Sequence, residues 1–443
     1  MTRSYLFALG LVCCLIAPAL RAQDTPASAV TAKEIHALDK AITRKVVTNT
    51  EETLSSDAMK GRAVFTPSID QAADFIVAQF KAAGLQPLTG DSYFQPFSLM
   101  HVTPRDVQVN LDGHTISPAL VAVSTSQVSL DWSSPDSVMV MTLDKEHNIR
   151  TALQVFRTDH KDMLVLLDSA SAEHIAQYSQ RLQDHMSTTH SLVMVAYSGP
   201  VNTLSIHIRS QISEKPLKNV VGILPGKERA DEWVIFSAHY DHLGIGKPDE
   251  KGDSIYNGAN DDASGTTAVL TLAKYFGARH DNQRTLVFAA FTAEEIGEYG
   301  SQYFATRMTP EKVVAMFNIE MIGTQSKWGN NSAYITGYER SDFGKILQKN
   351  LTGTGFEFYP DPYTSENLFY RSDNASLAKA GVPAHTISTS KMDSEPHYHK
   401  QSDEISTLDM ENMTRIIRSI ALSASSIISG EDTPSRVDTG GLR

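Results

Sequence analysis

The sequence predicts an α/β protein in which a mainly parallel, mixed sheet is flanked by helices and carries an inserted, mostly β accessory domain. From Asn219 onward, apolar strand-like runs alternate with helical patterns, which is typical of parallel sheets with helices on both faces. Residues 101–215 instead carry short β-like runs and a single helical stretch. The length of 443 residues and the apolar content of 41% allow more than one hydrophobic core.

Two helices are expected before the insertion. Thr31 and Glu34 form a capping box that precedes apolar residues at helical spacing. Thr66 is a second cap residue, Pro67 follows at the first helical position, and Gly84 ends that helix. We expect both helices to be packing elements.

The regular part of the chain predicts five strands and two long helices. The strands are expected at Val220–Leu224, Trp233–Ala238, Thr285–Phe291, Val313–Ile319 and Pro383–Ser388. The helices are expected at Asp262–Arg279 and Leu408–Ser429, where apolar residues recur at helical spacing. Because an open α/β sheet builds its sites at the carboxyl ends of its strands, we expect polar residues there to form the site.

The insertion shows a different pattern, in which short β-like runs predominate. Its β-like runs are Val107–Leu111, Val138–Met141, Met163–Leu167, Leu192–Ala196 and Leu204–Ile208. A helix is expected only at Ala172–Leu182. Histidines are scattered through this segment without ligand spacing beside carboxylates, so no site is predicted there.

The N-terminus has the pattern of an export signal. Arg3 precedes an apolar run from Leu6 to Leu20, and Ala22 offers a small residue for cleavage. A membrane anchor is the alternative, but the run is short for a span. Both cysteines lie inside this run, so any metal in the mature chain would be held by histidine and carboxylate. We expect a secreted or periplasmic protein.

These patterns divide the chain into four parts. They are a signal peptide at 1–22, a main domain at 23–100 and 216–430, an inserted domain at 101–215, and a flexible tail at 431–443. The net charge of −12 argues against a nucleic acid or an anionic membrane surface as the partner. The sequence does not determine the oligomeric state.

Ligand-type side chains follow the ends of the predicted strands. They are His239, Asp261, Glu294, Glu295, Glu320 and His399. Histidine and carboxylate ligands without thiolate suit a catalytic zinc site with an open position. Two divalent ions would offset three carboxylates and a hydroxide, and a metal pair activates a shared water. The sequence therefore predicts a two-metal hydrolytic centre.

Three neighbouring carboxylates are expected to support this centre. Glu294 precedes the ligand Glu295 and is the candidate general base. Asp241 lies two residues after His239, and Asp403 lies beyond the second ligand histidine in the chain. We expect these two aspartates to orient the ligand histidines through the other ring nitrogen.

Taken together, these motifs resemble the di-zinc aminopeptidases. They are His239-Tyr-Asp, Gly258-Ala-Asn-Asp-Asp-Ala-Ser-Gly265, Ala293-Glu-Glu-x-Gly297, Asn318-Ile-Glu-Met-Ile-Gly323 and Tyr398-His-x-x-x-Asp403. The family includes bacterial leucyl-type and vacuolar aminopeptidases, and its wider relatives include glutamate carboxypeptidase, transferrin receptor and glutaminyl cyclase. The similarity runs over about Asn219 to Ser429, with a weaker part at Leu54–Phe97.

The resemblance implies a zinc exopeptidase-like fold with two Zn²⁺ per chain. Asp261 would bridge the two ions, His239 and Glu320 would hold one, and Glu295 and His399 would hold the other. By the same family spacing, two further histidines close to the ligands, His242 and His397, are not expected to bind metal.

The leading hypothesis is a secreted zinc-dependent aminopeptidase acting on peptides. A hydroxide held by two zinc ions would attack the N-terminal peptide bond, and Glu294 would pass the proton to the leaving amine. A carboxypeptidase or dipeptidase is the sister hypothesis, and Arg340 or Arg371 would then clamp a C-terminal carboxylate. A glutaminyl cyclase-like transferase using one zinc and a receptor-like binding module without activity are further alternatives. Retention of all five ligand positions disfavours both of the last two.

Two positions depart from the family pattern. Glu320 stands where the family usually has aspartate, and its extra methylene allows bidentate binding or a shifted metal. Asn374 stands where many relatives have histidine, which puts a contact near the substrate in doubt. The bond after the bridging aspartate is often cis in the family, so Asp261–Asp262 is expected to be cis. The loops at 243–256 and 359–371 are expected to line the substrate pocket.

Overall fold

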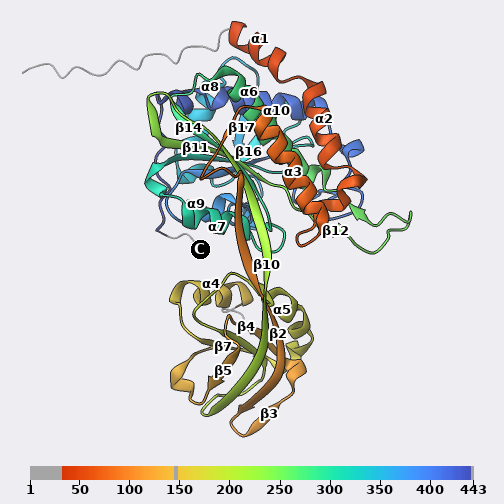
Figure 1. The fold of residues 1–443 in the computed structure, drawn as a ribbon, viewed down its shortest axis with the longest axis vertical. Coiled ribbons are helices and arrows are strands. Elements are labelled where there is room, and N and C mark those ends of the chain that lie inside the picture. Colours follow the sequence, from red (N-terminus) through yellow and green to blue (C-terminus); the bar gives the residue numbers. More distant parts are fainter. Residues whose placement is uncertain (1–31, 144–147, 441–443) are drawn as a thin grey trace, which may run out of the picture.

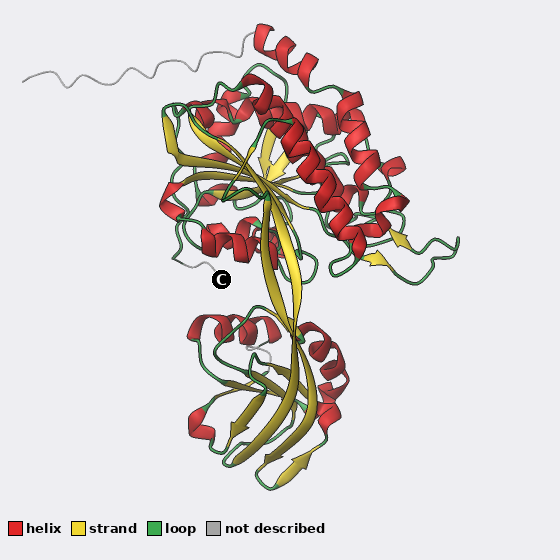
Figure 2. Cartoon of the chain, viewed as in Figure 1, coloured by secondary structure: helices red, strands yellow, loops and turns green. Residues whose placement is uncertain are grey.

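The computed structural model describes residues 32–143 and 148–440, so the predicted signal peptide at 1–22 lies outside the described residues. Two lobes are joined by β2 (Phe94–Leu111) and β10 (Leu204–Leu224), which pair antiparallel along most of their length (Figure 1). The larger lobe contains helices on both sides of a sheet, and the smaller lobe is richer in strand (Figure 2). Within the described ranges, no helix has the length and apolarity needed to cross a membrane.

The larger lobe is built on a mixed sheet, as predicted. The strand order is β17-β16-β18-β15-β11-β14-β10-β2-β3, and β3 pairs with the end of β2 that lies in the smaller lobe (Figure 1). The bounds not yet given are β3 (His114–Ile116), β11 (Arg229–His239), β14 (Arg284–Phe291), β15 (Val313–Ile319), β16 (Ser332–Ile335), β17 (Glu357–Pro360) and β18 (Ala384–Ser388). The central strands β14, β11, β15 and β18 run parallel, so their carboxyl ends meet at one edge.

Helices cover both faces of this sheet. One face packs against α2 (Arg44–Leu54), α3 (Pro67–Ala82), α6 (Ser264–Arg279), α8 (Phe343–Asn350) and α10 (Met410–Ser423). The other face packs against α7 (Tyr299–Arg307) and α9 (Asn374–Ala378). The strands between them are apolar on both sides because neither face meets water.

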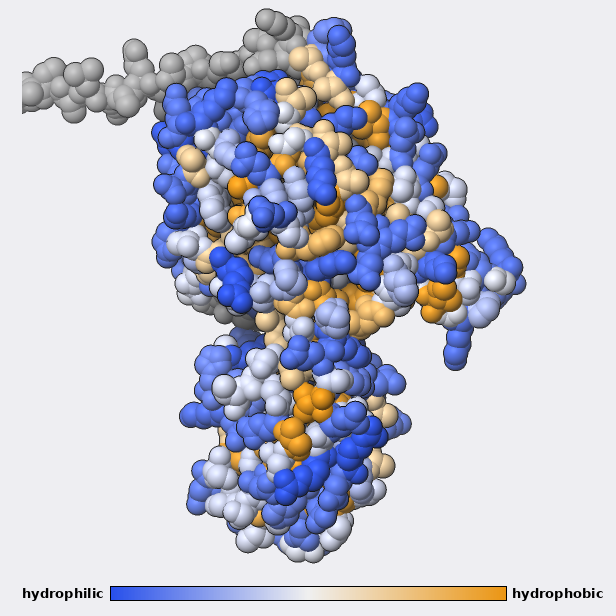
Figure 3. Space-filling view, viewed as in Figure 1, coloured by the Kyte–Doolittle hydropathy of each residue, from blue (hydrophilic) through white to orange (hydrophobic). Residues whose placement is uncertain are grey.

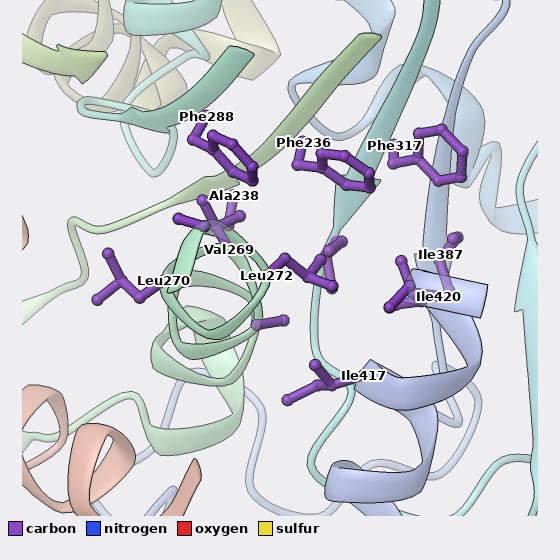
Figure 4. Packing of buried hydrophobic residues seen from close by; sticks show 14 of the residues in the cluster. Phe236, Ala238, Val269, Leu270, Leu272, Phe288, Phe317, Ile387, Ile417 and Ile420 are labelled. Carbon is purple, nitrogen blue, oxygen red and sulfur yellow. The ribbon is translucent and has the colours of Figure 1, made fainter. Parts of the chain in front are cut away.

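The core beneath α6 and α10 is centred on phenylalanines from neighbouring strands. Phe236 stacks on Phe288 and Phe317 with ring centroids 5.6 Å and 4.9 Å away. Figure 4 shows Leu272 of α6 and Ile420 of α10 facing these rings. Each fully buried side chain of this kind contributes about 1.5–3 kcal/mol. This packing fixes the strands whose ends carry the candidate site.

The smaller lobe contains a four-stranded sheet between two layers. Its strands are β4 (Val121–Ser124), β9 (Leu192–Ala196), β7 (Met163–Leu167) and β6 (Met139–Thr142), in that order. One face packs against α4 (Ile149–Asp159) and α5 (Ile175–Leu182), and the other faces β2, β10 and β5 (Ser129–Trp132). The predicted boundaries at 101 and 215 fall inside the two connecting strands, and α4, capped by the Asn148 side chain, was not predicted.

The single helix predicted after Thr31 is two helices. α1 (Ala32–Ala41) ends before Ile42, and Thr43 starts α2 by accepting a hydrogen bond from the N–H of Val46 at 3.3 Å. The closing helix is similarly divided into α10 and α11 (Ser425–Ser429). In both places the apolar spacing continues across the break, so periodicity alone did not reveal it.

The C-terminal segment was predicted to be flexible, but its described part, 431–440, is held to the larger lobe. The buried Arg284 donates hydrogen bonds to the backbone oxygen of Asp432 and to Thr433. Arg436 donates to the backbone oxygen of Val313, and Val437 is buried. A buried guanidinium needs acceptors for its N–H groups, and this segment supplies them.

Glu51 makes the stability of the larger lobe depend on pH. Its carboxyl lies buried in α2, and burial raises its pKa from 4.5 to about 8, although the nearby Thr267 hydroxyl and Arg62 guanidinium lower it. The folded protein therefore keeps a proton that the unfolded chain loses above its lower pKa. Stability should fall as pH rises from about 4.5 to about 8, with an upper limit of about 5 kcal/mol.

The variant Glu51→Gln should remove this dependence. Its melting temperature should match that of the wild type near pH 5 and exceed it near pH 8.5. The matched control is Glu52→Gln, one residue further on the exposed side of α2. Equal pH dependence in Glu51→Gln and the wild type would contradict the assignment.

Candidate metal centre

The structure brings the six candidate residues together at the carboxyl edge of the sheet. They are His239, Asp261, Glu294, Glu295, Glu320 and His399. Each comes from the end of a central strand or from the loop that follows it. The parallel arrangement of β14, β11, β15 and β18 explains why residues so far apart in sequence meet.

Asp261 lies at the centre of this group. Its Oδ1 is 3.3 Å from Nε2 of His239, and its Oδ2 is 3.2 Å from Nε2 of His399. The two carboxylate oxygens therefore face different histidines, as a bridging carboxylate requires. The side chain is buried, and the Asp261–Asp262 peptide bond is cis, as expected.

One metal position is outlined on the side of Glu320. Ligand atoms of His239, Asp261 and Glu320 all lie within 4.8 Å of one another. Nε2 of His239 is buried and has no hydrogen-bond partner among the described residues. The longer glutamate is anchored, because the Ser372 hydroxyl donates a short hydrogen bond to its Oε2.

The second position is outlined by Glu295 and two histidines. Oε2 of Glu295 is 3.2 Å from Nε2 of His399, and its Oε1 is 2.6 Å from Nδ1 of His242. Ligand atoms of His242, Asp261 and Glu295 also lie within 4.8 Å of one another. His242 was not expected to bind metal, and its contact with Glu295 and its place in this group leave that prediction untested. The spacing of His239 and His242 was the available sequence signal. His397 instead pairs with Ser402 at 2.9 Å.

Asp241 supports the centre in a different way from the one predicted. The Nδ1–H of His239 donates to the backbone oxygen of Asp241 at 3.1 Å, whereas the Asp241 carboxylate is 3.8 Å from that nitrogen. The carboxylate instead accepts hydrogen bonds from the backbone N–H groups of Glu294 and Glu295, at 3.2 and 3.4 Å. Asp241 therefore links the His239 loop to the Glu294–Glu295 loop.

Asp403 also differs from its predicted role of orienting His399. Its two oxygens accept hydrogen bonds from the backbone N–H groups of Asn260 and Asp261, at 2.9 and 3.0 Å. The loop that carries His399 therefore fixes the backbone of the bridging aspartate.

Asp262 has an equivalent role that the sequence did not reveal. It accepts hydrogen bonds from the backbone N–H groups of His239 at 3.3 Å and Met321 at 3.0 Å. Three buried aspartates thus tie each ligand-bearing segment to another.

Arg62 adds a further link to the N-terminal segment. Its buried guanidinium donates to the backbone oxygens of Leu54, Tyr240, Asn257 and Gly258, at distances of 2.6–2.9 Å. Two of these acceptors precede Asp261 in its loop, and another follows His239. The cation contributes positive charge beneath a strongly acidic site.

The charges of the site favour bound cations. Burial raises the pKa of Glu294 well above its ordinary value, and nearby Glu320 and Glu295 raise it further. Burial likewise raises the pKa of Glu320 to about 7. Burial also acts on Asp261, but the close ring nitrogens of His239 and His399 outweigh it and lower that pKa. So many buried carboxylates facing one another need cations to remain ionised together.

A cavity adjoins the Glu320 side of the centre. It is lined by Glu320, Met321, Tyr334, Thr336, Leu368, Arg371, Ser372, Thr386, Ser388, Met392 and Tyr398. The loop at 359–371 thus contributes lining residues, as expected. Its aromatic members Tyr363 and Phe369 are buried and do not line this cavity.

Of the two arginines proposed to bind a C-terminal carboxylate, the structure places only one at the cavity. Arg371 lines the cavity, whereas Arg340 lies 4.9 Å from the ring centre of Phe369 and donates to Tyr370. Asn374 is fully buried and bonds the backbone oxygen of Phe369. It is a packing residue in this structure.

Comparison with known proteins identifies the segment that carries this centre. The model of Peptidase family M28 matches residues 219–424. A probable leucine aminopeptidase of Trichophyton verrucosum is 29% identical over 208 residues, which is 44% of this chain and 53% of the relative. A probable zinc metalloprotease of Pyrenophora teres f. teres is 38% identical over 109 residues, or 24% of this chain and 23% of the relative. The chain thus spans about a quarter to a half of these relatives.

Two solved structures share the fold over most of the chain. The aminopeptidase from Aneurinibacillus sp. strain AM-1 has a TM-score of 0.52 at 19% identity, covering 92% of this chain and 98% of that one. The Bacillus subtilis zinc aminopeptidase BSAP has a TM-score of 0.55 at 17% identity, covering 88% and 97%. The family match over residues 219–424 and these shared folds agree with the resemblance drawn from the motifs.

Proposed function

We propose that this protein is an exported, zinc-dependent aminopeptidase that hydrolyses the N-terminal peptide bond of peptides with two Zn²⁺ per chain. The observation that carries the proposal is the position of Asp261, whose two oxygens face His239 and His399. The names of the relatives, zinc metalloprotease and leucine aminopeptidase, support the metal and the reaction. Export rests on the apolar run of the first 22 residues.

His239, Asp261 and Glu320 would hold one ion, and Asp261, Glu295 and His399 the other. Zinc bound there supplies a Lewis acid that acidifies water and polarises the scissile carbonyl. Aspartate hydrogen bonds fix the backbone of the ligand-bearing loops, so the donor atoms are positioned before metal or substrate arrives.

Glu294 is the proposed general base. Its Oε2 lies 3.9 Å from Nε2 of His239, and its backbone N–H is held by Asp241. Because burial raises its pKa, a proton taken from water is retained and can be delivered to the leaving amine. Bound cations would lower this pKa and favour the ionised carboxylate that accepts the proton.

Tyr398 is placed to bind the substrate carbonyl. It lines the cavity beside Glu320, and its ring stacks on His399 with a centroid distance of 3.9 Å. Burial raises the pKa of its hydroxyl, so the group stays protonated and can donate a hydrogen bond. We assign it the stabilisation of charge on the carbonyl oxygen.

A carboxypeptidase is the second candidate, and one observation favours it. Arg371 lines the cavity, where its guanidinium could bind a C-terminal carboxylate. Its Nη1 is already 3.3 Å from Glu366, so part of its charge is compensated. The aminopeptidase remains the first candidate because acidic groups dominate the centre and favour a substrate ammonium.

Glu294→Gln should separate metal binding from catalysis. Zinc measured by atomic emission should stay near two ions per chain, while kcat on aminoacyl-anilides should fall at least about 1000-fold. The matched control, Glu298→Gln, alters a neighbouring acid that is not a proposed ligand. Activity that survives in Glu294→Gln would exclude it as the base, and fewer than one zinc in the wild type would exclude the di-metal centre.

The two histidines beside Glu295 should behave differently. His399→Ala should lose one zinc per chain, because we assign His399 as the ligand. His242→Ala should retain both ions with weaker binding of one, since it bonds Glu295. Titration of zinc into the metal-free variants measures this. Loss of one zinc in His242→Ala, with both ions retained in His399→Ala, would make His242 the ligand.

Blocked peptides distinguish the two candidate functions. An aminopeptidase should cleave a tripeptide amide and leave its N-acetyl form intact. Arg371→Gln should change KM without reversing this preference. Cleavage of the N-acetyl peptide with a free C-terminus, lost in Arg371→Gln, would establish the carboxypeptidase instead.

A further inference from the structure

Exposed apolar side chains gather beside the proposed metal centre. Among the described residues, the large apolar side chains with at least 36% exposure are few, and half of them lie in loops that adjoin the ligands. These are Phe65 at 37%, Leu243 at 37%, Ile245 at 60% and Ile296 at 40%. We call these four residues the apolar rim. Isolated exposed apolar residues need no explanation, but a cluster at a site does.

Two members of the apolar rim directly follow residues of the centre. Leu243 follows His242, and Ile296 follows Glu295. The side chains of His242 and Glu295 are joined at 2.6 Å, so the two chain segments that carry Leu243 and Ile296 meet at the centre.

The other two members are packed against this side. Ile245 lies in β12 (Gly244–Ile245), which pairs with β13 (Ile255–Tyr256). A Cβ on Gly244 would lie 2.5 Å from that of Ala63, so the segment leading to Phe65 packs directly on β12.

The hairpin that carries Ile245 also reaches the His399 loop. The Gln401 side chain donates to the backbone oxygen of Lys247 at 2.7 Å. In Figure 3, apolar surface is visible around the β12 region and along the side of the larger lobe that faces the smaller one. The apolar rim is therefore built on fixed backbone next to the second metal position.

Asp261 belongs to two groups of candidate ligands. One group includes Glu320, which lines the cavity, and the other includes His242 and Glu295, which directly precede Leu243 and Ile296 of the rim. A peptide bound across the centre would place its N-terminal side chain in the cavity. The leaving amine, which Glu294 must reach, belongs to the second residue. That residue then lies beside Glu294 and Glu295, where Ile296 begins the apolar rim.

We propose that the apolar rim binds the side chain of the residue after the scissile bond, so that the substrates are peptides with an apolar second residue. This inference rests on the proposed aminopeptidase function and deepens it. Burial of an apolar side chain on Ile296 and Leu243 is the source of the preference. Polar or acidic second residues gain nothing from this surface, and acidic ones also meet the carboxylates of the centre.

The test compares two peptides that differ only in the second residue, Leu-Leu-Gly-Gly and Leu-Ser-Gly-Gly. The wild-type, zinc-loaded enzyme should show a kcat/KM about five- to twentyfold higher for the first peptide. Ile296→Ser and Ile245→Ser should each lower this ratio by about threefold or more, mainly through KM. Hydrolysis of Leu-Ser-Gly-Gly and the zinc content should stay within about twofold of the wild type.

Val128→Ser is the matched control, because Val128 is 66% exposed in the smaller lobe and outside the apolar rim. In this variant, the ratio of kcat/KM for Leu-Leu-Gly-Gly to that for Leu-Ser-Gly-Gly should equal the wild-type ratio. A wild-type ratio near one, or an unchanged ratio in both rim variants, would overturn the inference while leaving the aminopeptidase intact. A dimer that Ile245→Ser dissociates without any change in the ratio would show that the rim binds a second copy. Failure to cleave either peptide would overturn the function and the inference together.

Discussion

The centre depends on buried aspartate side chains that hold the backbones of the ligand-bearing loops. Asp403 fixes the N–H of Asp261, Asp262 fixes that of His239, and Asp241 fixes that of Glu295. Each aspartate follows one ligand in the chain and holds the backbone next to another. The ligand-bearing loops are therefore joined in series by these hydrogen bonds, and the side chains of the ligands remain available for metal. Charge-assisted hydrogen bonds of this kind are stronger than neutral ones, which suits a site that must be rigid.

Ionising these buried aspartates costs electrostatic free energy, which other parts of the lobe must offset. Burial raises the pKa of Asp241 to about 7 and that of Asp403 to about 6, so both resist ionisation inside the protein. Backbone N–H groups offset part of this cost, and Arg62 places a buried cation beneath the same loops. Divalent ions would offset most of the remainder. The phenylalanine layer below the sheet edge keeps the strands in register against this strain.

Much of the fold was predictable because the strands of the larger lobe are continuous apolar runs that end in polar residues. The candidate ligands followed from those ends, since parallel strands bring them to one edge. The supporting contacts were not predictable, because Asp241 and Asp403 lie close to histidines in sequence but bond the backbone of other loops in space. The contact of His242 with Glu295 was not predictable for the same reason, because Glu295 follows another strand. The C-terminal segment contains few apolar residues, and only the fold shows that Arg284 and Arg436 anchor it.

The central claim is that Asp261 carries two metal ions, one on each carboxylate oxygen. Crystals of the zinc-loaded protein measured above and below the zinc absorption edge test this directly. The account predicts two anomalous peaks, one between His239 and Glu320 and one between Glu295 and His399, both in contact with Asp261. A single peak, or two peaks of which only one contacts Asp261, would contradict it.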